Sequence, residues 1–341
     1  MTPINSAPPP NAPVKAALFG APSRSADVYG QGRRERIMAL TALHPTVVTG
    51  ENFDEHAPHL GEVQAVFATW GMPALSPQQL ESLPALRAVF YAAGSVQHFA
   101  RPLLERGVVV VSAWQALAAP VAEFVLAQIL LANKGYWRNT RHYRSPENYA
   151  GALRGRGNCG ATVALLGAGA VGRHLIQLLR PFDFRVLVFD PFLSREDAAQ
   201  LGVEKVSLED AFARGDVVSN HLANKPETSK LLNAPLFNQL REDATFINTG
   251  RGATVDEDAL LDALRARPSL TALLDVTEPE PPVSGSPFYH LPNVHLTSHI
   301  AGSIGAEVLR LADVCIEEFT TWRHDRPLRY AVSLEMLERL A

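Results

Sequence analysis

A glycine-rich turn between two apolar runs constrains the fold of this chain more than any other stretch. Residues 163–172 read Val-Ala-Leu-Leu-Gly-Ala-Gly-Ala-Val-Gly, a helical pattern follows to Arg180, and a second apolar run ends at Asp190. The order strand, glycine turn, helix, strand and acid predicts a βαβ unit that binds a dinucleotide. The alternative is a βαβ unit whose glycines serve only packing.

Each member of this turn has a mechanical role in the dinucleotide interpretation. Gly167 permits the tight turn, Gly169 lets the backbone approach a pyrophosphate, and Gly172 lets the helix pack close to the strand. Free N–H groups at the start of the helix attract phosphates. Asp190 follows Gly172 by 18 residues, near the spacing at which a carboxylate binds the ribose hydroxyls of NAD.

Length and composition indicate a globular protein of two domains. The chain has 341 residues, of which 47% are hydrophobic and 19% charged, and its net charge of −4 gives no reason to expect nucleic acid or an anionic membrane as partner. No apolar run approaches the 18 or so residues that span a bilayer. Cys159 and Cys315 form neither a disulfide framework nor a metal-ligand cluster, so we expect no metal site and a reducing, cytoplasmic location. The Pro-rich residues 1–13 are expected to be a disordered leader.

Polar side chains recur where the predicted strands end. Residues 14–112 alternate short strands and helices without a phosphate-type turn, and the alternation resumes after the glycine turn. In an open parallel sheet the carboxyl edge is where ligands bind. The strand-end residues are Asp190, His221, Arg251, Asp275 and His299.

Two further stretches are unusual. Residues 120–134 are apolar almost all round, which predicts a buried helix in which Glu123 needs a partner. Residues 136–149 are rich in tyrosine and arginine. This arm is either a solvated surface, a dimer contact or a contributor to an anion-binding pocket.

Three kinds of side chain at this edge suit acid–base chemistry on a carboxylic acid. Arg251 lies between two glycines, which free the backbone for a special turn, and its guanidinium can pair bidentately with a carboxylate. His299 can exchange the proton of a carbonyl/alcohol pair. Glu278 or Glu280 can orient that imidazole. The alternatives are a surface ion pair, a structural histidine and solvated loop charges.

These residues lie in segments that resemble a known family. Asn248-Thr-Gly-Arg-Gly252, Leu274-Asp-Val-Thr-Glu-Pro-Glu-Pro281 and Leu296-Thr-Ser-His-Ile-Ala-Gly302 look like the signature segments of the D-isomer-specific 2-hydroxyacid dehydrogenases. Phe189-Asp-Pro191 resembles the family's NAD half, and Pro120-Val-Ala-Glu-Phe124 its interdomain helix.

The resemblance implies an α/β fold of two Rossmann-like, doubly wound parallel-sheet domains. Residues 14–112 with 303–341 would form the substrate domain, and residues 113–302 the NAD-binding domain inserted into it. Family members are commonly dimers, so a homodimer is expected.

The resemblance also implies individual roles. Arg251 would bind the substrate carboxylate and carbonyl oxygen, His299 would be the acid/base, and Glu280, five residues after Asp275, would pair with it; Glu278 is the alternative. Asp275 would meet the nicotinamide amide. The residues expected at the cofactor are Gly167, Gly169, Ala170, Val171, Gly172, Asp190, His221, Thr249, Gly250, Arg251, Asp275, His299 and Gly302, and those at the substrate are Gly94, Ser95, Trp70 and Arg251.

The chain departs from the family pattern where a substrate would be selected. His221-Leu-Ala-Asn-Lys-Pro226 replaces the usual His-x-Pro-Leu-Thr segment, and Ser298 stands where a proline normally precedes the histidine. Loop residues Trp70, Met72 and His98 are expected to face the substrate. Together with Lys225 and the arm they suggest a sugar-derived acid larger than pyruvate.

The predicted activity is reversible hydride transfer between NAD(H) and C2 of a 2-hydroxy or 2-oxo acid. Asp190 favours NAD over NADP because a carboxylate repels a 2′-phosphate, although Arg195 lies nearby in sequence. One alternative is a non-enzymatic NAD(H)-sensing or corepressor-like protein on the same fold, against which the set Arg251, Glu280 and His299 weighs. The other is a formate-oxidising relative, which needs no glutamate on the histidine.

Overall fold

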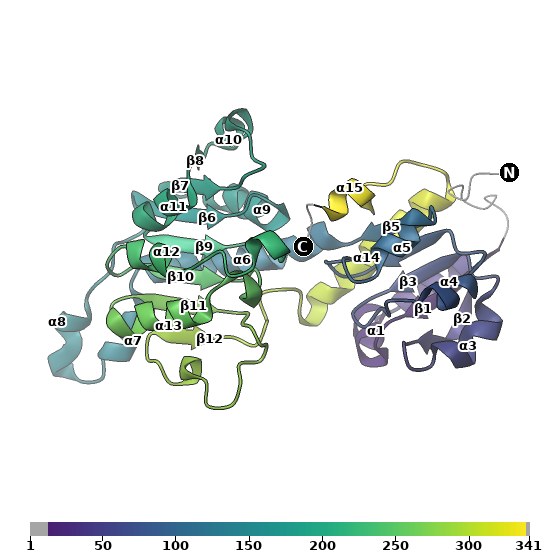
Figure 1. Cartoon of the computed structure of the whole chain (residues 1–341), viewed down its shortest axis with the longest axis horizontal. Helices are drawn as coiled ribbons and strands as arrows, with labels where there is room; N and C mark the ends of the chain where they lie inside the picture. The colour runs from purple at the N-terminus through teal and green to yellow at the C-terminus, as the bar shows by residue number, and fades with distance from the viewer. Residues whose placement is uncertain (1–12, 339–341) are drawn as a thin grey trace. The chain divides into compact units, whose positions relative to one another are not determined.

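The computed structural model describes residues 13–338, so the expected disordered leader falls outside the described residues except for Pro13. The described chain divides into two compact units (Figure 1). The first comprises the chain up to residue 117 together with the residues from 303 onward, and the second comprises residues 118–302. Helix α6, Trp114–Asn133, passes from the first unit into the second.

The second unit is built on a parallel sheet of seven strands in the order β12-β11-β10-β9-β6-β7-β8. Counted from β6, this is the 3-2-1-4-5-6 order of the Rossmann fold with one strand added. The strand order reverses between β6 and β9, where ligands of such sheets bind. The strands are β6 Ala161–Leu166, β7 Phe184–Phe189, β8 Glu204–Lys205, β9 Val217–Asn220, β10 Thr245–Asn248, β11 Thr271–Leu274 and β12 Val294–Leu296.

Helices cover both faces of this sheet because alternate strand residues point to opposite sides. On one face Leu166, Val218 and Phe246 pack with residues of α11, α12 and α13. On the other face Leu165, Val217 and Ile247 pack with residues of α6, α9 and α10. The helices of the unit are α7 Tyr136–His142, α8 Tyr149–Ala152, α9 Ala170–Leu179, α10 Arg195–Leu201, α11 Leu208–Arg214, α12 Ala234–Gln239 and α13 Glu257–Ala266, with 3₁₀ turns η1 Pro146–Asn148, η2 Pro226–Thr228, η3 Gly252–Thr254 and η4 Pro287–Tyr289.

The first unit has a six-stranded sheet in the order β13-β5-β4-β3-β1-β2. Its five parallel strands have the 2-1-3-4-5 order of flavodoxin-like folds, which is doubly wound like the Rossmann order. The strands are β1 Val14–Phe19, β2 Thr41–Val48, β3 Ala65–Ala68, β4 Ala88–Tyr91, β5 Val109–Ser112 and β13 Ala331–Val332. The helices are α1 Pro22–Val28, α2 Arg33–Leu40, α3 Phe53–Leu60, α4 Pro77–Glu81, α5 Ala100–Glu105, α14 Val308–Arg323 and α15 Leu334–Leu337, with η5 Gly305–Glu307 before α14.

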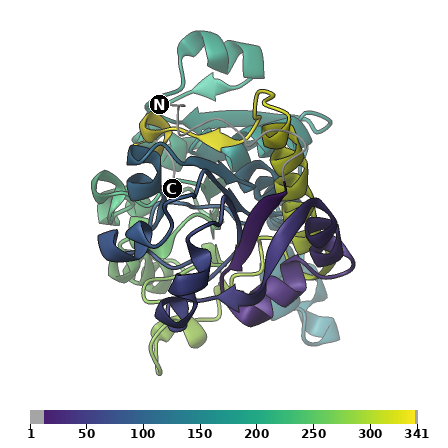
Figure 2. The same cartoon turned by 90° about the vertical axis from the view of Figure 1, so that its right-hand side faces the viewer.

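The end of the chain completes this first unit. Phe319 and Trp322 of α14 pack against the aromatic rings of Phe67 and Phe90 on β3 and β4. In Figure 2 the yellow α14 lies alongside the purple and blue strands of the N-terminal half. The prediction of an α/β doubly wound fold is confirmed. The first unit adds one antiparallel edge strand, β13, which pairs with β5.

Helix α6 differs from its prediction in two ways. It is not buried all round: Ala122, Val125 and Ile129 are in the core of the second unit, whereas Glu123 is exposed and needs no buried partner. In the described part of the chain, α6 alone is long and apolar enough to cross a membrane. The expectation that no run reaches that length is therefore wrong, although a core helix meets the same criterion.

Candidate functional site

The glycine turn joins β6 to α9 and is crowded at two of its three glycines. Gly167 has a φ of +104°, and a Cβ there would lie 2.9 Å from the carbonyl oxygen of His221. A Cβ on Gly172 would lie 2.1 Å from the carbonyl oxygen of Gly167. The first turn of α9 therefore packs on the glycine turn itself, which only glycine at 172 allows.

Gly169 is different, because a Cβ added there would meet no heavy atom within 4 Å. It is the exposed N-cap residue of α9, which begins at Ala170 and Val171. The first N–H groups of a helix have no partner within the helix and attract anions. The turn thus offers donors and open space to a pyrophosphate, as an NAD site requires.

Asp190 follows β7 and is fixed against the same turn. One carboxylate oxygen accepts a hydrogen bond from the Ala168 N–H at 2.7 Å, and the other accepts from Phe192 and Leu193 at 2.7 and 3.2 Å. These bonds hold the carboxylate at the carboxyl end of β7, beside the glycine turn. Arg195 begins α10 and is exposed.

His221, which follows β9, stays neutral beside Thr249, which follows β10. His221 lies with Nε2 3.0 Å from Ser219 Oγ and Nδ1 3.4 Å from Thr249 Oγ1. Burial lowers the pKa of His221 to about 4, because desolvation disfavours the charged imidazole. At neutral pH this side chain therefore adds hydrogen-bonding capacity without a positive charge.

Arg251 follows β10, and a buried polar network fixes its backbone. Its carbonyl accepts hydrogen bonds from Thr254 Oγ1 at 2.8 Å and Asn248 Nδ2 at 3.3 Å, and Asn248 in turn binds Asn220 Nδ2 at 2.9 Å. Both asparagines end buried strands. Their role was missed from sequence, although two asparagines ending neighbouring apolar runs were the available signal.

Gly250 and Gly252, beside Arg251, do not form the special turn that the sequence predicts. Arg251 itself is extended, with φ −143° and ψ 142°, so no special turn occurs there. A Cβ on Gly252 would lie 2.0 Å from the carbonyl carbon of Thr277, and one on Gly250 would lie 3.2 Å from the carbonyl oxygen of Asn220. The glycines therefore permit close packing of neighbouring backbones.

His299 and Glu280 form the central contact of the site. Nδ1 of His299 lies 2.6 Å from Oε1 of Glu280, and about half of each side chain is exposed. Glu280, not Glu278, makes this contact. His299 has a φ of +57°, an uncommon conformation for a residue with a side chain and one that is enriched at functional sites.

Asp275 holds the loop that carries this histidine. Its carboxylate accepts hydrogen bonds from Thr297 Oγ1 at 2.6 Å, Ile300 N at 2.8 Å and Ala301 N at 3.0 Å. Its carbonyl accepts from the His299 N–H at 3.1 Å. This anchoring of His299 was not predicted, since the resemblance assigned Asp275 only to the nicotinamide amide.

The site residues of the second unit lie at one edge of its sheet, but they do not all meet. Glu280 contacts His299. Burial lowers the pKa of Arg251, and the nearby Glu280 carboxylate offsets part of that effect. Asp190 follows β7, which β6 and β9 separate from β10. A pocket of about 570 Å³ is lined in part by Asp275, Glu280 and His299. The remaining predicted cofactor residues Gly250 and Gly302 follow β10 and the His299 loop.

The predicted substrate residues Gly94, Ser95 and Trp70 belong to the first unit. Gly94 and Ser95 follow β4, and the Gly94 carbonyl accepts a hydrogen bond from Ser112 Oγ at 2.6 Å. Trp70 follows β3 and lines a pocket of about 500 Å³ with Arg24, Ser303 and others.

The expectation for Met72 is wrong. Its side chain is 3% exposed and belongs to the core of the first unit, so it cannot face a substrate. His98 is exposed and places Nε2 3.0 Å from the Met72 carbonyl oxygen.

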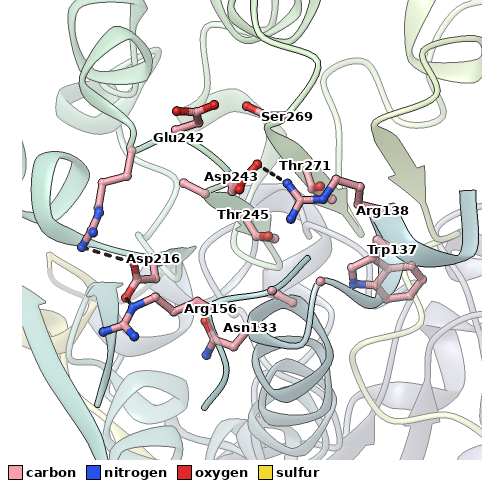
Figure 3. A pocket seen from close by; sticks show the side chains of 15 residues that line it. Asn133, Trp137, Arg138, Arg156, Asp216, Glu242, Asp243, Thr245, Ser269 and Thr271 are labelled. Carbon is pink, nitrogen blue, oxygen red and sulfur yellow. Dashed lines mark hydrogen bonds and ion pairs between the residues drawn. The ribbon is translucent and has the colours of Figure 1, made fainter. Parts of the chain in front are cut away.

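A second polar pocket lies at the opposite edge of the sheet of the second unit, where Asp216, Thr245 and Thr271 mark the amino ends of β9, β10 and β11 (Figure 3). Arg138 of the arm is ion-paired with Asp243 there. Asp216 is paired with Arg156 at 3.1 Å and Arg241 at 3.2 Å. Because Glu242 also lines the pocket, its three arginines face three carboxylates, and we assign no anion to it.

Residues 13–338 contain no group of three or more His, Cys, Asp or Glu side chains that could hold a metal ion. The candidate site comprises a turn suited to a pyrophosphate, a carboxylate beside it, a half-buried arginine and a His–Glu pair.

Residues 126–301 match the family model of the D-isomer specific 2-hydroxyacid dehydrogenase NAD-binding domain, which is more than half of the chain. D-3-phosphoglycerate dehydrogenase of Archaeoglobus fulgidus is 32% identical over 234 residues, which are 69% of this chain and 44% of that protein. The matched stretch thus spans less than half the length of this curated relative.

Solved structures resemble the chain over nearly its whole length. A phosphoglycerate oxidoreductase from Rhizobium etli is 25% identical with a TM-score of 0.78, covering 96% of this chain and 100% of that one. Rhodotorula graminis D-mandelate dehydrogenase has a TM-score of 0.80 at 22% identity, covering 94% and 98%, and supports the fold alone. The family's NAD-binding domain indicates NAD as the cofactor.

Proposed function

This chain belongs to the D-isomer specific 2-hydroxyacid dehydrogenase family, and from that membership we propose that it interconverts a 2-hydroxy acid and the corresponding 2-oxo acid with NAD(H). The observation that carries the proposal is the contact of 2.6 Å between His299 Nδ1 and Glu280 Oε1, in the same unit as the NAD-type glycine turn. A protein that only senses NAD(H) has no use for a carboxylate-oriented imidazole.

The protein's part in the reduction follows from three side chains. Arg251 binds the substrate carboxylate and the adjacent carbonyl oxygen, since a guanidinium offers paired donors. His299 holds a proton at Nε2 and transfers it to the carbonyl oxygen, while Glu280 accepts the Nδ1 hydrogen bond and stabilises the protonated ring. Bound NADH supplies the hydride that reaches C2. In the reverse direction His299 receives the proton of the alcohol.

The cofactor residues act by binding and orientation. The N–H groups at Gly169, Ala170 and Val171 would receive the pyrophosphate, and Asp190 the ribose hydroxyls. Neutral His221 and Thr249 would border the nicotinamide side without adding charge. Asp190 favours NAD over NADP.

For the substrate we propose a sugar-derived acid larger than pyruvate. The names of the relatives, which include D-3-phosphoglycerate dehydrogenases, support an acid of this size. The pocket with Arg24 and Trp70 in the first unit offers a cation and an aromatic surface to such a molecule.

We also propose a cytoplasmic homodimer. The arm, residues 136–149, exposes Tyr136, Tyr143 and Tyr149 by 43%, 49% and 59%. Exposed aromatic rings gathered on one segment are typical of a protein contact.

The decisive experiment follows NADH absorbance with a panel of 2-oxo acids, including 3-phosphohydroxypyruvate and other sugar-derived acids. We expect turnover with at least one acid, and a loss of roughly 10²–10⁴-fold in His299→Ala with NADH binding retained. If His299→Ala turns over at the wild-type rate, the acid/base assignment is wrong. NADH binding without turnover of any acid would instead identify a sensing protein.

A further inference from the structure

Glu257 contacts the loop that carries Glu280, although neither the motifs nor the reaction uses it. It is the first residue of α13, and its Oε1 accepts a hydrogen bond of 2.8 Å from the backbone N–H of Glu278. Glu278 is two residues before Glu280. The bond therefore joins a helix to the loop that carries the partner of His299.

Other contacts fix the same loop. Thr277 packs its backbone on Gly252, where even a Cβ would find no room. Thr277 Oγ1 donates to the Pro279 carbonyl at 2.9 Å, and Tyr289 Oη donates to the Pro282 carbonyl at 3.1 Å. Glu257 supplies the bond at Glu278, between these two ends.

The loop is stiff enough to transmit a displacement. It reads Glu278-Pro-Glu-Pro-Pro282, and each proline ring fixes φ near −65°. A shift at the Glu278 amide thus moves the carboxylate of Glu280 instead of being absorbed by Pro279, the one residue between them.

We propose that Glu257 is a positioning residue that holds the loop of residues 277–282 so that Glu280 meets His299. The inference rests on the proposed function for its catalytic consequence. The hydrogen bond and the loop that it holds exist independently of turnover.

The surroundings of Glu257 make its protonation, and with it the stability of the fold, sensitive to pH. The carboxylate faces Glu278 and Asp258, which disfavour its charge, and Lys230, which favours it. Desolvation is the largest cause and raises the pKa of Glu257 to about 7. Since the folded state retains a proton that the unfolded chain releases, this residue's contribution to stability falls as pH rises from about 4.5 to about 7.

Substitutions of Glu257 by glutamine and by alanine separate its role as a hydrogen-bond acceptor from its charge. Glu257→Gln keeps an oxygen that accepts from the Glu278 N–H and removes the charge. Glu257→Ala removes both. Asp258→Ala is the matched control, because it deletes an exposed carboxylate from the same first turn of α13 and thus the same interaction with the helix dipole.

Two readouts that need no turnover test the loop. The first is the hydrogen exchange of the Glu278 amide, and the second is the tautomer of the His299 ring from its ¹⁵N shifts at alkaline pH. We expect the amide to exchange faster and the Nδ1–H tautomer to lose population in Glu257→Ala, and both to stay as in wild type in Glu257→Gln and Asp258→Ala. Unchanged values in folded Glu257→Ala would overturn the proposal, even if the protein had no dehydrogenase activity.

Kinetics test the catalytic consequence. In Glu257→Ala we expect kcat for 2-oxo acid reduction to fall about 10- to 100-fold, since small misplacements of catalytic groups have effects of that order, with KM for NADH unchanged. Glu257→Gln should restore kcat and should also be more heat-stable than wild type above pH 7, with the difference vanishing in acid. Equal kcat in Glu257→Ala and wild type would refute a positioning role, as would a Gln variant as impaired as the Ala variant.

Discussion

At the scale of single residues, the loop of residues 277–282 distinguishes two glutamates that each precede a proline. Glu280 contacts His299 Nδ1, whereas Glu278 offers its backbone N–H to Glu257 and has an exposed side chain. Glu280→Gln removes the charge that stabilises a protonated imidazole. Glu278→Gln is its matched control.

We therefore expect Glu280→Gln to lower kcat for 2-oxo acid reduction at least 10-fold and Glu278→Gln to change it less than 2-fold, because only the first variant weakens proton donation. Steady-state kinetics with NADH absorbance measure both. Equal losses in the two variants would contradict the assignment of Glu280.

The conformation of His299 also belongs to this scale. Its φ of +57° is maintained because Asp275 binds the chain on both sides of the residue, at Thr297 and at Ile300. The orientation of the imidazole thus depends on a buried carboxylate of a neighbouring strand.

At the scale of elements, two glycines in the connection of β6 to α9 are expected to have different roles, Gly172 in packing and Gly169 in binding. Gly172 is crowded by the Gly167 carbonyl at 2.1 Å, but Gly169 faces open space. Gly172→Ala must push α9 away and is expected to lower stability by about 1–3 kcal/mol and to weaken NADH binding.

Gly169→Ala should leave the melting temperature near that of wild type and weaken NADH binding alone, because its methyl group occupies the surface that a pyrophosphate approaches. Calorimetry and NADH fluorescence titration measure the two effects. The interpretation fails if Gly169→Ala is the less stable variant or if Gly172→Ala melts like wild type.

At the scale of the whole molecule, the arm of residues 136–149 is expected to join two chains. Tyr143→Asp with Tyr149→Asp places charge on the exposed rings and should convert a dimer to a monomer in sedimentation velocity. Met38→Asp, at a residue of α2 exposed by 56%, is the control and should sediment like wild type. A wild-type monomer, or a dimer that the arm variant leaves intact, would exclude this contact.

The sequence alone determined the NAD half and singled out Arg251 and His299 as candidate site residues. Apolar runs of strand length that are followed closely by Asp, His or Arg predict strands that share a ligand edge, because parallel strands present their carboxyl ends together. β1 and β10 are short runs of this kind, and α4 begins with a cap formed by residues close in sequence, Ser76 and Gln79 forming a capping box. Local patterns suffice for these elements.

Only the tertiary structure decided how the reactive groups are held. The choice of Glu280, the anchoring of the His299 loop by Asp275, the packing of Thr277 on Gly252 and the bond from Glu278 to Glu257 all join residues at least 19 positions apart. Such contacts depend on which strands are neighbours and at what register. The same reason explains β13, a two-residue strand formed only because β5 presents an edge to it.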